Sequence, residues 1–277
     1  MSVPPAPPGS SAAPAPEHLL ALATDVATRA ARLLVEGLGR ERTSVRTKST
    51  STDMVSEMDR ASEQLIAREL LTARPDDGIV GEEGSARTGT SGLRWVVDPL
   101  DGTTNYLYGF PGWSVSIAVE DDAGVVAGVV VDPSHRDVFT AARGGGARRN
   151  GEAIRCSAQT VLAETLVGTG FNYAADQRRR QAEVLVSLLP QVRDIRRMGA
   201  ASVDLCSVAC GRLDAYYERG LSWWDVAAGS LIAAEAGAVI SSLNGGPVSG
   251  DSVMASAPGV SASLSELLRS LCAQDVS

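Results

Sequence analysis

Histidine is almost absent from this chain: His18 and His135 are the only two among 277 residues, and neither stands in a recognisable motif. This scarcity argues against a mechanism built on a histidine acid or on a Ser-His-Asp triad. Long apolar runs are also missing, because none reaches the ~20 residues that a membrane span requires. The first residues lack the basic start and apolar core of a signal peptide. We therefore expect a cytoplasmic protein with no membrane partner.

Cysteine is scarce and irregularly spaced, at Cys156, Cys206, Cys210 and Cys272. This spacing is typical of buried reduced thiols rather than of a disulfide framework. Cys206 and Arg212 do match the C-x-x-x-x-x-R loop of cysteine phosphatases. The residues around Cys206 nevertheless have the pattern of a buried helix face, and no histidine precedes it. We interpret these cysteines as core residues.

Basic residues are outnumbered, since 25 Lys and Arg stand against 33 Asp and Glu, for a net charge of -8. Nucleic-acid binding needs a basic surface, so we expect no nucleic-acid partner. An acidic protein can still bind an anionic phosphate ester where divalent cations reverse the local charge. The hydrophobic fraction of 44% predicts a globular protein with an ample core.

The sequence pattern predicts one folded domain behind a short tail. Residues 1–16 are rich in Pro, Ala and Ser and predict a disordered tail. Residues 17–277 predict a single domain, with an α+β half over 17–155 and an α/β half over 156–277. Asn150-Gly151 is a type I′ turn signal in the first half. In the second half strands alternate with helices, which predicts helices layered on sheets.

The predicted elements of the second half follow that alternation. The strands lie near 165–169, 193–197, 213–218, 238–242 and 252–256, and the helices near 176–189, 200–210, 225–236 and 260–273.

The stretch from Trp95 to Asn105 organises the rest of the chain. Its β-branched start predicts a buried strand that ends at Asp98, because Pro99 cannot continue the ladder. Asp98 and Asp101 then face one small space at a turn, and Gly102 lets the backbone approach a ligand. Two carboxylates beside a helix start suit a hard cation together with a phosphate. An ordinary surface turn is the alternative interpretation of these residues when they are taken alone, because Asp and Gly are common turn formers.

Two further acidic positions stand at element ends. Gly81-Glu82-Glu83 follows an apolar pair that predicts a strand, and Asp225 stands near the N-cap of a helix rich in small residues. Together with Asp98 and Asp101, these carboxylates could converge on one metal cluster.

At this point the chain resembles the magnesium-dependent, lithium-sensitive inositol monophosphatases. The resemblance lies in G-E-E at 81–83, D-P-L-D-G-T-T-N at 98–105 and W-D-V-A-A-G at 224–229. G-T-G-F at 168–171 and the stretch 204–218 look most like the actinobacterial inositol-1-phosphatases. The resemblance implies the layered αβαβα sandwich, of mixed α/β (α+β) class, that this family shares with fructose-1,6-bisphosphatases.

The resemblance also implies a set of metal ligands and two to three Mg²⁺ ions. Glu82, Asp98 and the Leu100 carbonyl would hold the first ion. Asp98, Asp101 and Asp225 would hold the second, and a weaker third ion would lie near Glu82. Lithium would compete at the second position.

Catalytic roles follow from the same resemblance. Glu82 and Asp98 act through the metal, and Thr103 helps to orient the attacking water. Asp53 belongs to the family pattern D-x-V-T-x-x-D, matched here with Ser56 in place of the Thr, and is counted as catalytic. The predicted substrate contacts form a larger set: Asp101, Gly102, Thr103, Gly199, Ala200, Ala201, Glu218 and Asp225. Many relatives carry a hydroxyl residue where this chain has Ala200.

The expected function is Mg²⁺-dependent hydrolysis of inositol 1-phosphate, a phosphoric monoester hydrolase activity. Histidinol phosphate or fructose 1,6-bisphosphate remain alternative substrates, because Glu218 suits a polyol or an ammonium group, or is only a surface charge. A regulatory binding protein that keeps the fold is the alternative of another class. Aspartyl-phosphate chemistry is disfavoured, because Pro99 occupies the position of its nucleophile. By resemblance we also expect a homodimer.

Overall fold

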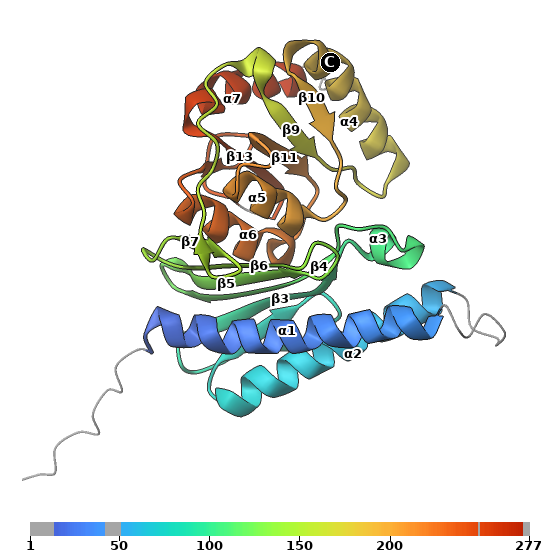
Figure 1. The fold of residues 1–277 in the computed structure, drawn as a ribbon, viewed down its shortest axis with the longest axis vertical. Helices are drawn as coiled ribbons and strands as arrows, with labels where there is room; N and C mark the ends of the chain where they lie inside the picture. The colour runs from blue at the N-terminus through green and yellow to red at the C-terminus, as the bar shows by residue number, and fades with distance from the viewer. Residues whose placement is uncertain (1–13, 42–50, 249, 274–277) are drawn as a thin grey trace, which may run out of the picture.

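The structure, a computed structural model, describes residues 14–41, 51–248 and 250–273. Its elements stack in five layers, with helices α1 and α2, a first sheet, helices α5 and α6, a second sheet, and helices α4 and α7 (Figure 1). The expected αβαβα sandwich is confirmed. The predicted tail falls mostly outside the described residues, and α1 begins at Pro16.

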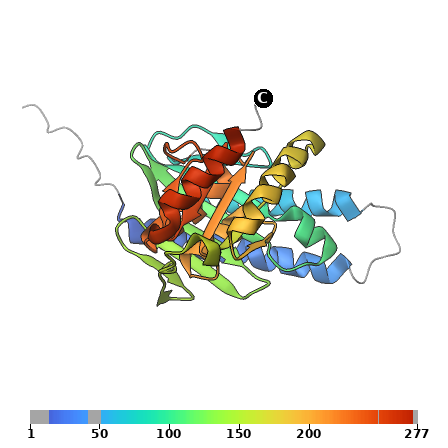
Figure 2. The same cartoon turned by 90° about the horizontal axis from the view of Figure 1, so that it is seen from above.

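The helices are α1 (Pro16–Glu41), α2 (Ser51–Ala73), α3 (Thr103–Tyr108), α4 (Ala175–Leu188), α5 (Ala201–Ala209), α6 (Trp223–Glu235) and α7 (Pro258–Ala273). Short 3₁₀ turns cover Leu162–Glu164 and Leu189–Gln191. No described helix has both the length and the apolar character that crossing a membrane requires. Seen from above, α4 and α7 lie over one face of the second sheet (Figure 2).

The first sheet has the strand order β2-β1-β3-β4-β5-β6-β7-β8. Its strands are β1 (Gly78–Gly81), β2 (Ala86–Arg87), β3 (Arg94–Asp101), β4 (Ser114–Asp121), β5 (Gly124–Asp132), β6 (Asp137–Ala142), β7 (Ala147–Arg149) and β8 (Glu152–Ala153). β1 pairs parallel to β3, and the other pairs are antiparallel. Because strand side chains alternate between faces, Trp95 and Val97 pack with α1 and α2 while Val96 packs with α6.

The second sheet has the order β10-β9-β11-β13-β12. Its strands are β9 (Leu166–Thr169), β10 (Asp194–Arg196), β11 (Ala215–Arg219), β12 (Val239–Ser241) and β13 (Ser252–Ser256). β9 pairs parallel to β10 and β11, whereas β13 pairs antiparallel to β11 and β12. Every strand and helix predicted for this half is present within a few residues.

Small residues allow the central helix layer to pack closely. A Cβ added to Gly128 on β5 would lie 2.9 Å from the Cα of Ala228, and one added to Gly229 would lie 2.8 Å from the Cβ of Leu205. These contacts explain the small residues of α6, which packs against the first sheet and α5 together. Cys206 on α5 is fully buried, as the core interpretation predicted, whereas Cys156 and Cys210 are only partly buried.

The predicted end of the central strand at Asp98 is wrong, because β3 continues through Pro99 to Asp101. Asp98 pairs with Ser116 of β4 and Asp101 pairs with Ser114, so three steps along β3 match two along β4. This irregularity is a β-bulge, one of the places in a sheet that accept proline. Side chains three apart on a regular strand point to opposite faces, whereas here Asp98 and Asp101 line one cavity.

Candidate active site

A cavity of about 260 Å³ lies between the bulge of β3 and loops of the second half. Its lining includes every metal and substrate position predicted from the sequence: Glu82, Asp98, Leu100, Asp101, Gly102, Thr103, Gly199, Ala200, Ala201, Glu218 and Asp225. Residues more than a hundred positions apart thus meet at one place. The remaining predicted site residue, Asp53, lies on α2, and its side chain is outside the described ones.

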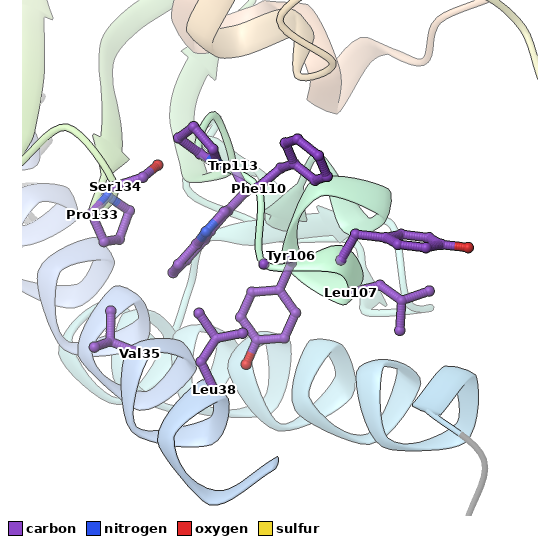
Figure 3. Close-up of a pocket in the computed structure, with 11 residues that line it drawn as sticks. Val35, Leu38, Tyr106, Leu107, Phe110, Trp113, Pro133 and Ser134 are labelled. Atoms are coloured by element: carbon purple, nitrogen blue, oxygen red, sulfur yellow. The ribbon is translucent and has the colours of Figure 1, made fainter. Parts of the chain in front are cut away.

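A larger cavity of about 460 Å³ lies beside α1 and α3 (Figure 3). Its lining is mainly apolar and aromatic, with Val35 and Leu38 from α1 and with Tyr106 and Trp113, whose rings meet edge to face at 5.0 Å. No carboxylate or basic side chain of the described residues lines it. Phosphate ester hydrolysis needs convergent charged groups, so the smaller cavity is the candidate site.

Hydrogen bonds around the bulge of β3 hold Asp98 in place. Asp98 is 1% exposed, and its Oδ1 accepts a hydrogen bond from the Leu100 amide at 3.1 Å. The Thr103 hydroxyl donates to the Leu100 carbonyl at 3.1 Å, and the Ser62 hydroxyl of α2 donates to the Pro99 carbonyl at 3.0 Å. These bonds fix the Asp98 carboxylate and the Leu100 carbonyl relative to each other.

Asp225 reaches the cavity from the first turn of α6. The sequence predicted this residue near the N-cap, but the N-cap is Ser222 and Asp225 is three residues further on. The two form a capping box, in which the Ser222 amide donates to Asp225 Oδ2 at 2.6 Å. The cap thus orients the carboxylate that lines the cavity.

Crowding of acidic groups dominates the electrostatics of this cavity. Burial, together with the charge of Asp225, raises the pKa of Glu82 to about 7 and that of Asp101 to about 8. Burial and the charge of Asp101 raise the pKa of Asp98, and burial raises that of Asp225. The charges of Glu82 and Asp225 also raise the pKa of Asp98. The metal-free site therefore holds negative charge that protons or cations must balance.

This donor set suits a hard divalent cation. Buried carboxylates and a backbone carbonyl are the oxygen ligands that Mg²⁺ prefers, and their raised pKa values show a shortage of positive charge. Among the described His, Cys, Asp and Glu side chains, no three already meet as a closed metal-binding group. Because Mg²⁺ usually keeps several of its waters, a closed protein cage is not required.

The raised pKa values predict how stability of the metal-free protein depends on pH. These carboxyls have pKa values near ~4 in an unfolded chain, so the folded chain holds more protons between about pH 4 and about pH 8. The free energy of unfolding of the metal-free protein should therefore fall as pH rises through this window. The increase in stability on adding Mg²⁺ should become larger from about pH 6 to about pH 8. Thermal unfolding with EDTA and with Mg²⁺ measures both, and a metal-free Tm that rises with pH would contradict the prediction.

Glu218 lies at the second-half side of the cavity. It is partly buried, and its Oε2 accepts a hydrogen bond from the Tyr216 hydroxyl at 2.5 Å. A Cβ added to Gly170 would collide with this carboxylate, so glycine at that position leaves room for it. Glu218 is thus held in place, unlike a free surface charge.

Among the residues that the predicted site omits, a buried carboxylate and an arginine at or beside the cavity carry charge. Asp59 on α2 is 4% exposed, and burial together with the charges of Glu82 and Glu83 raises its pKa to about 8. Its Oδ1 has no hydrogen-bond partner in the described part of the chain. Within the described part of the chain, Arg197 is the one Lys or Arg residue that lines the cavity. The D-x-V-T-x-x-D pattern contains Asp59, whereas no motif pointed to Arg197.

Comparison with known proteins places this site in a family. The model of the inositol monophosphatase family matches residues 15–276, which is almost the entire chain. The chain belongs to the inositol monophosphatase family. The predicted resemblance is therefore confirmed, and with it the expectation of a phosphatase enzyme of this family.

Relatives in this inositol monophosphatase family carry two kinds of name. The inositol-1-monophosphatase SuhB of Mycobacterium tuberculosis is 46% identical over 237 residues, covering 82% of this chain and 81% of the relative. The Nus factor SuhB of Xylella fastidiosa is 45% identical over 194 residues, 70% of each protein. The solved structure of Mycobacterium tuberculosis SuhB has a TM-score of 0.81 and 40% identity, with 93% of this phosphatase and 98% of that chain covered.

Proposed function

We propose that this phosphatase hydrolyses inositol 1-phosphate to myo-inositol and phosphate in a Mg²⁺-dependent reaction at the 260 Å³ cavity. One observation carries the proposal: the buried Asp98 carboxylate lines an acidic cavity together with Glu82, Asp101 and Asp225, and the charges of all three act on it. A carboxylate in this central position can serve two cations at once. The relatives named inositol-1-monophosphatase support the choice of substrate.

The proposed ligands divide between two Mg²⁺ positions. Glu82, Asp98 and the Leu100 carbonyl would hold one ion, and Asp98, Asp101 and Asp225 the other, with a weaker third position near Glu82. Bound Mg²⁺ supplies activation of a water and neutralisation of charge on the phosphoryl oxygens.

The chain's own groups would position the reactants. The Thr103 hydroxyl, next to the Leu100 carbonyl, would orient the attacking water, and the amides of Gly102 and Thr103 would contact the phosphate. Asp53 remains a proposed catalytic residue on α2. We add Asp59 of the same helix, because its unpartnered oxygen lies in the field of Glu82 and Asp98.

The proposed preference for a neutral polyol rests on Glu218 and Arg197. Asp101 and Glu218 offer oxygens that can accept hydrogen bonds from ring hydroxyls, and Gly199, Ala200 and Ala201 line the same wall. Burial raises the pKa of Glu218, and the positive charge of Arg197 opposes this shift by balancing part of the Glu218 charge. An ammonium group such as that of histidinol phosphate would meet this guanidinium, which favours an uncharged ring instead.

Phosphate release by the purified protein, with Mg²⁺ and with chelator, tests the proposal. The substrates are inositol 1-phosphate, histidinol phosphate, fructose 1,6-bisphosphate and an adenosine bisphosphate. We expect Mg²⁺-dependent turnover with inositol 1-phosphate preferred. Preference for histidinol phosphate would keep the metal site and overturn the role given to Glu218 and Arg197.

A regulatory function is the second candidate, because some relatives are named Nus factor. Converging carboxylates favour catalysis, because a binding module does not need them. Absence of turnover with every ester would favour the regulatory function instead. A homodimer, inhibition by lithium and a cytoplasmic location also remain proposals that rest on the family resemblance.

A further inference from the structure

Ser202, at the start of α5, makes two hydrogen bonds to one oxygen of Asp101. Its amide donates to Asp101 Oδ2 at 2.8 Å, and its hydroxyl donates to the same atom at 2.5 Å. The two residues lie 101 positions apart in the sequence. Both bonds act on a carboxylate that lines the cavity.

These two hydrogen bonds make the two oxygens of Asp101 different from each other. Oδ2 accepts two hydrogen bonds, whereas no described residue donates one to Oδ1, so Oδ1 is the oxygen that can present its lone pairs to a ligand in the cavity. A carboxylate held at one oxygen also loses the freedom to rotate. Hydrogen bonds of this kind orient metal-binding carboxylates and tune their affinity.

Ser114 continues the contact into the first sheet. The hydroxyls of Ser114 and Ser202 are 2.7 Å apart, and both serines are fully buried. An ionised carboxylate, the form that would bind Mg²⁺, can only accept, so in that form the single proton of the Ser202 hydroxyl goes to Asp101 and Ser114 donates to Ser202. Ser114 is also the β4 partner of Asp101 across the bulge. The hydrogen bonds therefore run in one direction, from Ser114 to Ser202 and from Ser202 to Asp101, and end at the cavity.

We propose that Ser202 is a positioning residue, which holds Asp101 with Oδ1 presented to the Mg²⁺ and substrate side of the cavity. The inference rests on the proposed function for the identity of the ion. The contact itself comes from α5, which no motif of the metal site includes, and it locks the second half of the chain onto the bulge of β3.

Mg²⁺ binding measured by calorimetry on the full chain tests this role. Ser202→Ala keeps the amide bond and loses the hydroxyl bond, so we expect Mg²⁺ affinity to fall about 10-fold, the lower end for loss of such a contact. Ser230→Ala is the matched control, because Ser230 is a buried serine of α6 whose hydroxyl has no partner among the described residues. Its affinity should stay within about twofold of wild type.

Two further variants separate positioning from a general effect on folding. Ser202→Ala leaves the buried Ser114 hydroxyl without an acceptor, so the double variant Ser114→Ala, Ser202→Ala removes both partners and should show the same loss of affinity. In an Asp101→Asn background, adding Ser202→Ala should cost little more, because the two residues act as a unit.

Each outcome decides the inference. Wild-type affinity in Ser202→Ala, or a full additional loss in the Asp101→Asn background, would overturn the positioning role. A wild-type protein that binds no Mg²⁺ would overturn this inference and the proposed function together. A protein that binds Mg²⁺ with the expected Ser202 dependence but hydrolyses no ester would overturn only the proposed function.

Discussion

Asp98→Asn should lower the rate of phosphate release by at least ~10²-fold, the usual loss when one electrostatic stabiliser of a transition state is removed. Asp98 is a buried carboxylate that lines the cavity with Glu82 and Asp225 and lies in the field of both, so its charge would serve both proposed ions. Asparagine keeps the shape and one oxygen but loses that charge. Steady-state phosphate release at saturating Mg²⁺ measures the effect.

Stability distinguishes this loss from misfolding. The Asp98 carboxylate is buried near Asp101 and Glu82, so its charge opposes folding while no metal is bound. The variant should therefore unfold at the same or a higher temperature than wild type in EDTA, although it is nearly inactive. Asp121→Asn is the control, since Asp121 is an exposed carboxylate paired with Arg143 on the first sheet. Near-normal activity of Asp98→Asn would contradict the proposed mechanism.

The fold of the second half could be predicted because its signals are local. Apolar periodicity and glycine or proline at element ends placed each strand and helix there within a few residues. Asp225 could have been placed more accurately as well, because Ser222 stands three residues before it and S-x-x-D is a readable capping signal. Helix α6 therefore begins at Trp223, two residues before its predicted start.

The course of the central strand could not be predicted, because it depends on a partner. Pro99 alone indicates a strand end, and the sequence contains nothing local that opposes this interpretation. The ladder to Ser114 and Ser116 of β4, with a bulge to absorb the extra residue, carries β3 onward to Asp101. The same bulge brings Asp98 and Asp101 to one cavity. The prediction that these two carboxylates share a site was therefore correct, although a bulged strand and not a turn brings them together.

The tertiary contacts of Ser202 and Arg197 could not be predicted from the sequence for a related reason. Ser202 and Arg197 stand in no motif, and their importance comes only from the residues they approach, Asp101 and Glu218. Family motifs identify groups that meet the ligand directly. Residues that hold those groups in place are identified by tertiary structure.

Thr103 offers the second large effect, because its hydroxyl is the one side-chain group proposed to act on the water itself. Thr103→Val keeps the branched shape and removes the hydroxyl that donates to the Leu100 carbonyl. We expect kcat to fall about 10²-fold, the lower range for loss of a positioned proton-handling group. The Michaelis constant should change much less, because the Gly102 amide and the carboxylate ligands remain.

Thr103→Ser is the matched variant, since it restores the hydroxyl and lacks only the methyl group. We expect it to keep kcat within about 10-fold of wild type, so the difference between Ser and Val isolates the hydroxyl. If Thr103→Val instead raises the Michaelis constant and leaves kcat unchanged, Thr103 contributes to substrate binding alone. The water would then have to be oriented by carboxylates, and Asp59, whose unpartnered oxygen lies near Glu82, would be the residue to substitute next.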